Sequence, residues 1–349
     1  GRQIIRDMMI ETARLRELLD QFPKLTIGLL GDLFLDRYLE FDPAVNELSI
    51  ETGLDAFQVE HVRNSPGALG TVMNNLAAIG VGQLVPITVI GDDGHGDDLM
   101  RELRRLPCNT KHVIRAADRL TPTYMKPLRL GHDGVWTEMN RLDVRTRGPL
   151  SVAVCEQLGE SLREAFDQCD GLIVLDQVNE TDWGVVNDQV RKVLAELMAA
   201  SPNKLVFIDS RTHLDYFSHG ILKANQDELL ATTTGLDEPT AENVMDAAKQ
   251  LSLRTGQAVF CTLGAEGMLV ARPAEEPELI PGFSVTGSID IVGAGDGATS
   301  GIVTALLSGS TEAEAAQIGN LVASITIQQL GTTGTASPDQ ILSRRREYP

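Results

Sequence analysis

Short apolar runs alternate with longer segments of helical period along this chain. The runs are rich in Val, Ile and Leu and apolar on both faces, as is typical of strands buried in a parallel sheet. The alternation predicts a doubly wound α/β domain with a mostly parallel sheet flanked by helices. The expected strands are 25–31, 84–91, 171–176, 205–209, 220–223 and 258–263. The expected helices are 69–79, 96–105, 150–167, 183–199, 239–255, 296–307, 311–329 and 337–346.

Three segments fall outside this alternation. An N-terminal segment of about 3–20 has apolar residues at helical spacing and predicts a helix packed on the domain or on a partner. Segments 36–62 and 121–147 lack a helical period and contain strand-like patches with aromatic residues. We interpret these two as an inserted β-layer that covers the edge of the sheet as a lid. Because the chain has no internal repeat and no obvious linker, we expect residues 1–349 to form one domain.

The charge of the chain narrows the choice of partners. It carries 49 acidic and 30 basic residues, a net charge of −19. Such a chain repels phosphate backbones and anionic lipids, so we expect no nucleic acid and no membrane partner. No apolar stretch approaches about 18 residues, which argues against a membrane span. The four cysteines are scattered without a C-x-x-C pair, a pattern that suits a reducing cytoplasm.

The most specific feature is the segment DIVGAGDG at 290–297, which precedes a helical run. Glycines just before a helix let backbone N–H groups converge on an anion, and the helix dipole adds to the attraction. Asp296 falls in the first turn of that helix, where a carboxylate would repel a bound phosphate. It is suited instead to take a proton from an attacking hydroxyl. The alternative is that Asp296 only caps its helix, and the residues alone leave both interpretations open.

The other candidate nucleotide-binding motifs are weaker or missing. Gly293, Gly295 and Ala298 satisfy a loose dinucleotide-binding pattern, but two helices and no convincing strand follow it. A P-loop sequence does not occur, which argues against a P-loop kinase. The segments TLGAEG at 262–267 and GTTGT at 331–335 follow a strand and a helix. Each is either an ordinary turn or part of a nucleotide site.

Several charged residues have a structural and a functional interpretation. The acidic residues at 92, 93, 97 and 98 are better explained as charges in the first turn of a helix than as a metal site. The six histidines show no triad pattern. Most basic residues in the lid and the cleft are expected at the surface, and one or two are candidates to bind a substrate phosphate. These are Arg63, Lys126, Arg129, Arg141 and Arg211.

These motifs, taken with the segment KANQDE at 223–228, resemble the PfkB/ribokinase family of carbohydrate kinases over about residues 25–346. The closest likeness is to the kinase module of ADP-heptose synthases, which phosphorylates a heptose 7-phosphate at its anomeric hydroxyl. It is carried by GDLFLDRY at 31–38, RLD at 141–143 and LGTTGTASP at 330–338. The nucleotidyltransferase half of those enzymes has no counterpart here. The resemblance implies a ribokinase-like fold and ATP-dependent phosphorylation of a sugar or sugar phosphate in the cytoplasm, with a homodimer formed through the lid.

The resemblance also implies roles for individual residues. Asp296 would be the general base, and the backbone of Gly293, Ala294 and Gly295 would be the anion hole. ATP and Mg²⁺ are the implied cofactors, with Glu228 holding the metal through water, and K⁺ is a candidate monovalent cation at Asp290. The implied cofactor-binding residues are Asn225, Glu228, Thr262, Gly264, Gly267, Asn320 and Gly334. The implied substrate-binding residues are Asp36, Gly67, Thr71, Lys126, Arg141 and Arg211, of which Arg211 would bind the substrate's own phosphate.

One departure from the family pattern affects the substrate end. Where the family has two adjacent glycines followed by an asparagine, this chain reads SPGALGT at 65–71. Ala68 adds a methyl group where the backbone should approach the substrate, and Thr71 lacks the two amide donors of asparagine. Kinase chemistry is therefore better supported than heptose as the substrate. The alternatives are a non-catalytic regulator that binds a sugar or a nucleotide, and a nucleoside kinase.

Overall fold

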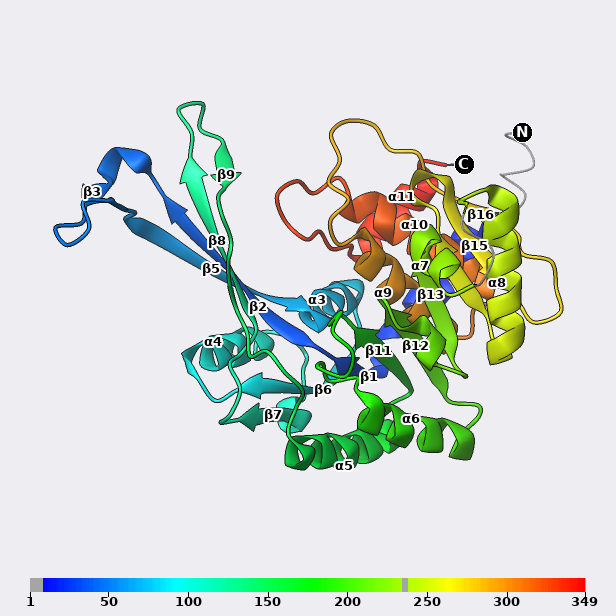
Figure 1. Cartoon of the computed structure of the whole chain (residues 1–349). Coiled ribbons are helices and arrows are strands. Elements are labelled where there is room, and N and C mark those ends of the chain that lie inside the picture. Colours follow the sequence, from blue (N-terminus) through cyan, green and yellow to red (C-terminus); the bar gives the residue numbers. More distant parts are fainter. Residues whose placement is uncertain (1–8, 234–237, 349) are drawn as a thin grey trace.

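A nine-stranded sheet forms the centre of the molecule (Figure 1). The computed structural model describes residues 9–233 and 238–348. The sheet has the order β16-β15-β14-β13-β12-β11-β1-β6-β7, in which the β14–β15 and β15–β16 pairs are antiparallel and the other neighbours are parallel. Its strands are β1 (Thr26–Gly31), β6 (Gln83–Gly91), β7 (Val113–Ala116), β11 (Gly171–Asp176), β12 (Leu205–Ser210), β13 (Ile221–Asn225), β14 (Val259–Thr262), β15 (Gly267–Ala271) and β16 (Glu278–Pro281).

Helices cover both faces of this sheet. One face packs against α2 (Thr12–Leu19), α3 (Leu69–Ile79), α4 (Gly94–Leu103), α9 (Ala294–Leu307), α10 (Glu312–Thr326) and α11 (Pro338–Arg346). The other face packs against α5 (Val152–Gln168), α6 (Asp188–Ala200), α7 (Gln226–Ala231) and α8 (Ala241–Thr255). Because both faces are covered, the strands are apolar on both sides, which is the pattern that marked them in the sequence. The expected doubly wound fold is confirmed.

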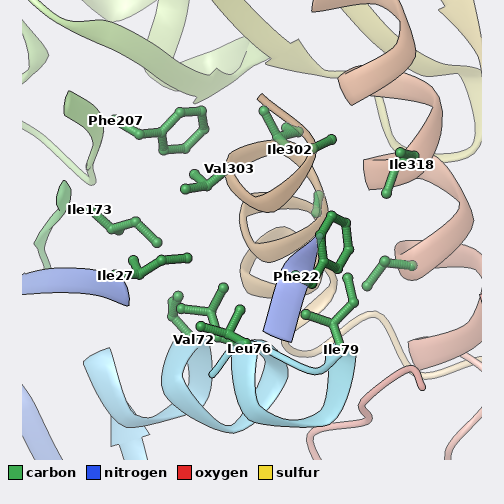
Figure 2. Close-up of a cluster of buried hydrophobic side chains, with 14 of the residues drawn as sticks. Phe22, Ile27, Val72, Leu76, Ile79, Ile173, Phe207, Ile302, Val303 and Ile318 are labelled. Atoms are coloured by element: carbon green, nitrogen blue, oxygen red, sulfur yellow. The ribbon is translucent and has the colours of Figure 1, made fainter. Parts of the chain in front are cut away.

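The core on the α9 side surrounds the middle of that helix. Figure 2 shows Ile302 and Val303 of α9 in one cluster with Phe207, Ile173 and Ile27 from three strands. The same cluster includes Val72, Leu76 and Ile79 of α3 and Ile318 of α10. All of these side chains are almost fully buried. These contacts hold the middle of α9 between the sheet, α3 and α10.

A second sheet leaves the body of the molecule at the carboxyl end of β1 and projects away from it (Figure 1). It has the order β10-β8-β2-β5, with β9 paired to β8, and a small pair β3–β4 lies in the excursion between β2 and β5. Its strands are β2 (Leu33–Phe41), β3 (Glu47–Leu48), β4 (Asp55–Ala56), β5 (Val59–Ala68), β8 (Thr123–Leu130), β9 (Trp136–Glu138) and β10 (Leu142–Val144). We call this sheet, residues 33–68 and 123–144, the lid.

The observed elements differ from the expected ones mainly at boundaries and edges. The lid begins three residues before 36 and continues to Ala68, because β2 follows β1 almost directly and β5 runs into α3. The helix expected at 183–199 begins at Asp188, because Asn187 caps it by accepting a hydrogen bond from the N–H of Val190. Strands β7, β15 and β16 were not expected; β7 and β16 lie at the two sheet edges, and β15 lies between β14 and β16. Of the expected N-terminal helix, residues 1–8 lie outside the described part, and Thr12–Leu19 is helical.

Within residues 9–233 and 238–348, none of the helices combines the length and the apolar character that a membrane crossing requires.

Candidate active site

Charged and polar residues collect at the carboxyl ends of the parallel strands. Asp176 ends β11, Asp209 and Ser210 end β12, and Asn225 ends β13. Asp32 follows β1 directly, and Thr262 ends β14 beside Asn225. Since the strands are parallel, these ends meet at one edge of the sheet, which is where ligands bind in open α/β folds. The lid and the first turn of α9 lie at the same edge.

The N-terminus of α9 has the geometry of an anion site. Its N-cap, Gly293, has a φ of 81°, which favours glycine, and a Cβ there would approach Thr333 Cγ2 within 2.5 Å. The N–H of Ala294 donates to the carbonyl of Ile291, so this one of the three expected donors is engaged. Across the described residues, no acceptor takes the N–H of Gly293, Gly295 or Asp296. These three groups are available to a phosphate.

Asp296 lies among charges of both signs. Burial raises the pKa of this carboxyl to about 7, with a further rise from Asp209, while Lys223 and Arg211 act in the opposite direction. A carboxyl with a pKa near neutrality can accept a proton in the physiological range, as a general base must. Ser300 Oγ donates to the backbone carbonyl of Asp296, and among the described residues no hydrogen bond or ion pair engages the Asp296 carboxylate. The carboxylate itself therefore remains free to meet a substrate hydroxyl.

Lys223 is a buried cation beneath the start of α9. Its side chain is only 7% exposed, and its Nζ donates to Asp209 Oδ2 at 2.8 Å. Burial by itself would lower the pKa of Lys223, but Asp209, Asp296 and Glu228 together raise it. A Cβ added to Gly295 would lie 3.4 Å from the Lys223 Nζ. The ammonium group is thus adjacent to the expected anion hole.

Asn225 and Glu228 form a capping box at the start of α7. Asn225 Oδ1 accepts from the N–H of Glu228 at 2.9 Å, and Glu228 Oε2 accepts from the N–H of Asn225 at 2.8 Å. Burial and the nearby Asp209 raise the pKa of Glu228, although the bond from Asn225 opposes them. Thr262 Oγ1 contacts the Ala224 carbonyl at 3.5 Å, which brings Thr262 next to this box. These three expected residues therefore lie together beside Lys223.

The donor set fits Mg²⁺ that arrives with a nucleotide. No described group of three or more His, Cys, Asp or Glu side chains could hold a metal ion by itself. Mg²⁺ usually takes one or two carboxylates, several waters and substrate phosphates. Asp209 lies close enough to Glu228 to raise the pKa of that carboxyl. The free N–H groups at the start of α9 would hold the phosphates. Glu228 and Asn225 are the residues of this group that would hold the metal's waters.

Three expected substrate residues meet on one face of the lid. Asp36 of β2 pairs with Lys126 of β8, with 3.2 Å between Asp36 Oδ1 and Lys126 Nζ. A Cβ added to Gly67 of β5 would approach Asp36 Oδ2 within 2.4 Å. Tyr38 lies on the same face and packs against Lys126. This face provides a carboxylate, a cation and a bare backbone, which together suit a polyhydroxylated ligand.

The departure from the family pattern has a structural consequence at Ala68. This residue has a φ of 52° and lies at the N-cap of α3, a conformation that favours glycine. The backbone therefore keeps the shape that a glycine would adopt, at the cost of strain in Ala68. Thr71 is buried in the first turn of α3, and its carbonyl accepts from Asn75 Nδ2. The altered segment, residues 65–71, therefore still forms the end of β5 and the start of α3.

A cavity of about 370 Å³ lies between the lid and the sheet edge. Phe34 and Tyr124 of the lid contribute one wall, and the segment 177–185 after β11 contributes another. Four arginines also line it: Arg119, Arg145, Arg147 and Arg211. We call Asp209, Lys223, Glu228 and the first turn of α9 the transfer region. Arg211 lies between the cavity and this region, because it acts on the pKa of both Asp296 and Glu228.

Two buried carboxylates hold the cavity wall. Asp32 Oδ1 accepts from the N–H of Val185 at 2.8 Å, and Oδ2 accepts from the N–H of Gln177 at 3.2 Å. Burial and the adjacent Asp176 raise the pKa of Asp32 to about 6, although its backbone donors oppose this. Asp176 accepts from Ser210 Oγ and bonds the His213 ring, and its carbonyl accepts from the N–H of Arg211. One carboxylate thus clamps both ends of segment 177–185, and the other orients the Arg211 segment.

Other expected residues lie away from these groups or use their side chains elsewhere. Asn320 of α10 is buried and donates to the carbonyls of Ile280 and Pro281, which ties α10 to β16. A Cβ on Gly334 would meet the Thr326 carbonyl at 2.5 Å. The Asp290 side chain accepts from the N–H of Val292, and Arg141 pairs with Asp143. Gly264 and Gly267 start and end the turn into β15.

Sequence reasoning missed the charges that complete the site. Lys223 was seen only as part of a motif, and Asp209 only as the end of a strand. Their signal in the sequence is a charged residue that ends an otherwise apolar strand, which is rarely buried without a partner. Arg119, Arg145 and Arg147 offered no comparable signal, because they lie in irregular segments that only the fold brings to the cavity.

Comparison with known sequences finds related proteins along nearly the whole chain. A family model described as pfkB family carbohydrate kinase matches residues 183–340. The bifunctional protein HldE of Desulfatibacillum aliphaticivorans is 24% identical over 331 residues, which are 94% of this chain and 64% of that protein. The bifunctional protein HldE of Paramagnetospirillum magneticum is 26% identical over 342 residues, which are 97% of this chain and 67% of that protein. The chain thus spans about two thirds of the length of these relatives.

Solved structures share the fold at lower identity. Arabidopsis thaliana ribokinase complexed with ribose and ATP superposes with a TM-score of 0.64 at 17% identity, covering 92% of this chain and 99% of that chain. Phosphofructokinase-2 from Escherichia coli in complex with potassium has a TM-score of 0.68 at 18% identity, covering 93% of this chain and 99% of that chain.

The raised pKa of Asp296 predicts a pH-dependent gain in stability for Asp296→Asn. The folded state holds this proton more tightly than the unfolded chain does, so stability falls as pH rises from about 4 to about 7. Above pH 7 the ionised carboxylate is a constant penalty that Asn removes. We expect thermal unfolding at pH 8 to show a Tm higher by on the order of a few degrees, with the gain vanishing near pH 4.

Asp246→Asn provides the matched control, since Asp246 is exposed on α8. Its Tm should follow that of the parent chain at both pH values. A Tm for Asp296→Asn that is lower at pH 8, or a gain that persists at pH 4, would contradict the electrostatic account.

Proposed function

We propose that this chain, a kinase similar to the pfkB family of carbohydrate kinases, transfers the γ-phosphoryl group of ATP to a hydroxyl of a sugar or sugar phosphate. The observation that carries the proposal is the position of Asp296. Its carboxylate lies in the first turn of a helix whose leading N–H groups are free, next to a buried lysine. A base and an anion site in contact are what phosphoryl transfer to a hydroxyl requires.

Asp296 acts as the general base. The acceptor oxygen attacks the γ-phosphorus in line while the bond to the β,γ-bridging oxygen breaks and ADP leaves, and Asp296 takes the proton that the acceptor oxygen loses. The pKa of about 7 is suited to that step, because a large share of the carboxyl groups is ionised at neutral pH and the carboxylate is basic enough to accept the proton. The proton can leave to water once the product departs.

The charge that spreads over the transferring phosphoryl group is stabilised from three directions. The N–H groups of Gly293 and Gly295 donate along the axis of α9, where the helix dipole adds to the attraction. Lys223 contributes a fixed positive charge beneath Gly295. Arg211 contributes another from the cavity side. Lys223 is held in place by Asp209, so its charge does not have to reorganise during the reaction.

Asn225 and Glu228 would hold the waters of Mg²⁺, which supplies charge neutralisation on the phosphate oxygens when it is bound with ATP. Thr262 and the turn at 264–267 follow the adjacent strand and would lie along the nucleotide. Asp290 stays our candidate for a monovalent cation such as K⁺. Its carboxylate accepts from one backbone N–H and has further oxygen lone pairs for an ion.

The acceptor lies between the lid and the transfer region. Asp36 and Lys126 would bind its hydroxyls, and the bare backbone at Gly67 allows a close approach. A sugar resembling heptose 7-phosphate is our first candidate, because of the resemblance of the motifs to the heptose kinase module. The glycine-like backbone at Ala68 supports a retained sugar site.

Replacing Asp296 with Asn should abolish turnover without abolishing binding. We expect kcat to fall by about 10²–10⁴ because the base is lost, with the affinity for ATP kept within a few fold. In the parent enzyme, kcat/KM should rise with pH through about 7 as Asp296 ionises. The assay is ADP release from Mg-ATP with K⁺, against hexoses, heptoses, their phosphates and nucleosides.

Asp246→Asn again serves as the control and should turn over like the parent. Turnover that survives in Asp296→Asn would remove this residue from catalysis. ATP binding without ADP release on any acceptor would favour the regulator, and turnover on nucleosides alone would favour a nucleoside kinase.

The capping box allows the metal role of Glu228 to be tested apart from its structural role. Gln can replace Glu in a capping box, so Glu228→Gln should change stability by less than about 0.5 kcal/mol. It removes the charge, so the Mg²⁺ concentration for half-maximal activity should rise by about tenfold, or about 1.4 kcal/mol. Glu228→Ala should show the same rise and also lose roughly 1 kcal/mol of stability with its cap. An unchanged Mg²⁺ requirement in both variants would argue against the role.

We also propose a homodimer in which lids from two copies pair. The lid exposes several large apolar side chains on and beside its outer strands: Leu48, Ile50, Leu54, Val62, Val135, Trp136 and Leu142. Ile50 is fully exposed. Exposed apolar residues grouped in this way usually mark a protein contact. The four free cysteines agree with a reducing compartment such as the cytoplasm.

Sedimentation velocity at micromolar concentration should show the dimer, and Ile50→Glu should shift it towards monomer. Leu253→Glu is the matched control, because Leu253 is also exposed but lies on α8. A parent chain that sediments as a monomer, or an equal shift in both variants, would overturn the lid-mediated dimer.

A further inference from the structure

The Arg211 side chain has no anchor of its own. Among residues 9–233 and 238–348, no acceptor takes the N–H groups of its guanidinium. It lines the cavity, and its charge acts to lower the pKa of Asp296 and of Glu228. Arg211 lies in the turn 210–213, between β12 and a short 3₁₀ helix, Leu214–Tyr216. The backbone of this turn therefore decides where the charge of Arg211 can lie.

A closed set of hydrogen bonds ties this turn to the end of β11. Ser210 Oγ donates to Asp176 Oδ2 at 3.0 Å and accepts from the N–H of His213 at 3.0 Å. The His213 ring bonds the same carboxylate, with 3.1 Å between Nδ1 and Oδ2. The N–H of Arg211 donates to the Asp176 carbonyl at 3.1 Å. We call Asp176, Ser210 and His213 the polar cluster.

All three members of the polar cluster are buried. An ionised carboxylate can only accept hydrogen bonds, so Asp176 requires the proton of its His213 bond on Nδ1. Burial raises the pKa of Asp176, and the hydrogen bonds from Ser210 and His213 oppose that rise. A buried carboxylate that loses a donor costs the chain more than an exposed one would. Loss of His213 is therefore expected to disturb Asp176 and the turn that it holds.

The His213 ring is held from a second side. It stacks on Tyr216, with ring centroids 5.0 Å apart and planes 10° apart. The Arg191 guanidinium of α6 lies 4.6 Å from the centroid of Tyr216 and pairs with Asp182 at 2.9 Å. The charged groups around His213 are thus Asp176 and, across Tyr216, Arg191. The stacking contact keeps the imidazole in the orientation that its bond to Asp176 requires.

The turn begins inside the transfer region. Asp209 directly precedes Ser210, and its carboxylate pairs with Lys223 at 2.8 Å. A Cβ on Gly295, in the first turn of α9, would lie 3.4 Å from that ammonium group. Arg211 comes two residues after Asp209. A shift of the backbone at 210–213 would therefore move the Arg211 charge relative to the start of α9.

We infer that His213 is a positioning residue of phosphoryl transfer: with Ser210 it holds the Asp176 carboxylate, and this polar cluster orients Arg211 towards the transferring phosphoryl group. The inference rests on the proposed function, because that function gives Arg211 its ligand. His213 acts through Asp176 and Arg211 rather than on the substrate. Since the charge on the phosphoryl group spreads in the transition state, a misplaced Arg211 should lower kcat more than it changes binding.

Three variants open the polar cluster at different points. His213→Leu removes the imidazole donor, His213→Asn keeps an N–H donor, and Ser210→Ala removes the hydroxyl. Ser252→Ala is the matched control, because Ser252 is as fully buried as Ser210 and its hydroxyl donates to the Gln257 carbonyl at the end of α8. The measurements are ADP release against pH, with kcat and both KM values, and the Tm of every variant.

We expect kcat to fall by about tenfold or more in His213→Leu and in Ser210→Ala, with the KM values for ATP and the acceptor within a few fold. His213→Asn should recover part of the loss, and Ser252→Ala should turn over like the parent. Arg211→Gln should also lower kcat. The double variant Arg211→Gln/His213→Leu should lose no more than Arg211→Gln alone, because His213 acts through Arg211.

The pH profile separates positioning from a loss of stability. Asp209, Lys223 and Arg211 are the charged groups that act on Asp296, and Arg211 opposes the rise of its pKa. A displaced Arg211 opposes it less, so the increase of kcat/KM, centred near pH 7 in the parent, should move to higher pH. This displacement is expected in His213→Leu, Ser210→Ala and Arg211→Gln. A purely structural role would lower the Tm without moving the profile.

A further readout needs no activity. The pKa of Asp296 is higher in the folded than in the unfolded state, so its stability penalty at pH 8 grows when that pKa rises further. The Tm gain from Asp296→Asn at pH 8 should therefore be larger in the His213→Leu and Ser210→Ala backgrounds than in the parent. An equal gain in all three backgrounds would overturn the positioning role. Additive losses of kcat in the double variant would overturn it as well.

The positioning role and the kinase proposal can fail separately. ADP release with the parent's kcat and pH profile in both His213→Leu and Ser210→Ala would keep the kinase and overturn the role of His213. A larger Tm gain in those backgrounds, in a protein that releases no ADP on any acceptor, would keep the placement of Arg211 and overturn the kinase.

Discussion

The buried ion pair between Lys223 and Asp209 is the interaction on which the transfer region depends. Three carboxylates, those of Asp209, Glu228 and Asp296, surround one ammonium group at the end of the sheet. Burial raises the pKa values of Glu228 and Asp296, and the ammonium group opposes that rise in both. Removing one partner of a buried pair leaves an uncompensated charge, which typically costs about 3–5 kcal/mol. The pair therefore keeps Asp296 usable as a base and places a positive charge under the anion hole.

The carboxyl edge of the parallel sheet supplies both halves of the proposed reaction. Strands β12, β13 and β14, with α9, provide the transfer region, while β1, β11 and the lid provide the cavity. Arg211 follows β12 and lies at the boundary between them. The clamp at Asp32 matters for the same reason, since it fixes both ends of the segment that walls the cavity. In the proposed reaction, one edge of the sheet would therefore orient both the nucleotide and the acceptor.

The substitution at Ala68 shows why a motif departure must be judged on the backbone. From the sequence, alanine for glycine suggests that the substrate end of the site has changed. The structure keeps the backbone at a φ of 52°, so the chain accepts strain in an alanine rather than adopting another path. The methyl group and the missing amide at Thr71 are then local changes in shape and donors on an otherwise preserved frame.

Local signals in the sequence determined the fold class, most of the buried strands and the segment around Asp296, because hydrophobic period and glycine spacing act over a few residues. Strands β7, β15 and β16 were not predicted; two of them are the edge strands of the central sheet, and β15 lies between β14 and β16. Only the tertiary structure decided that Lys223 meets Asp209 and that Arg145, Arg147 and Arg211 share one cavity. Those side chains come together through crossover connections, so the strand order, which no local pattern encodes, sets which charges become neighbours.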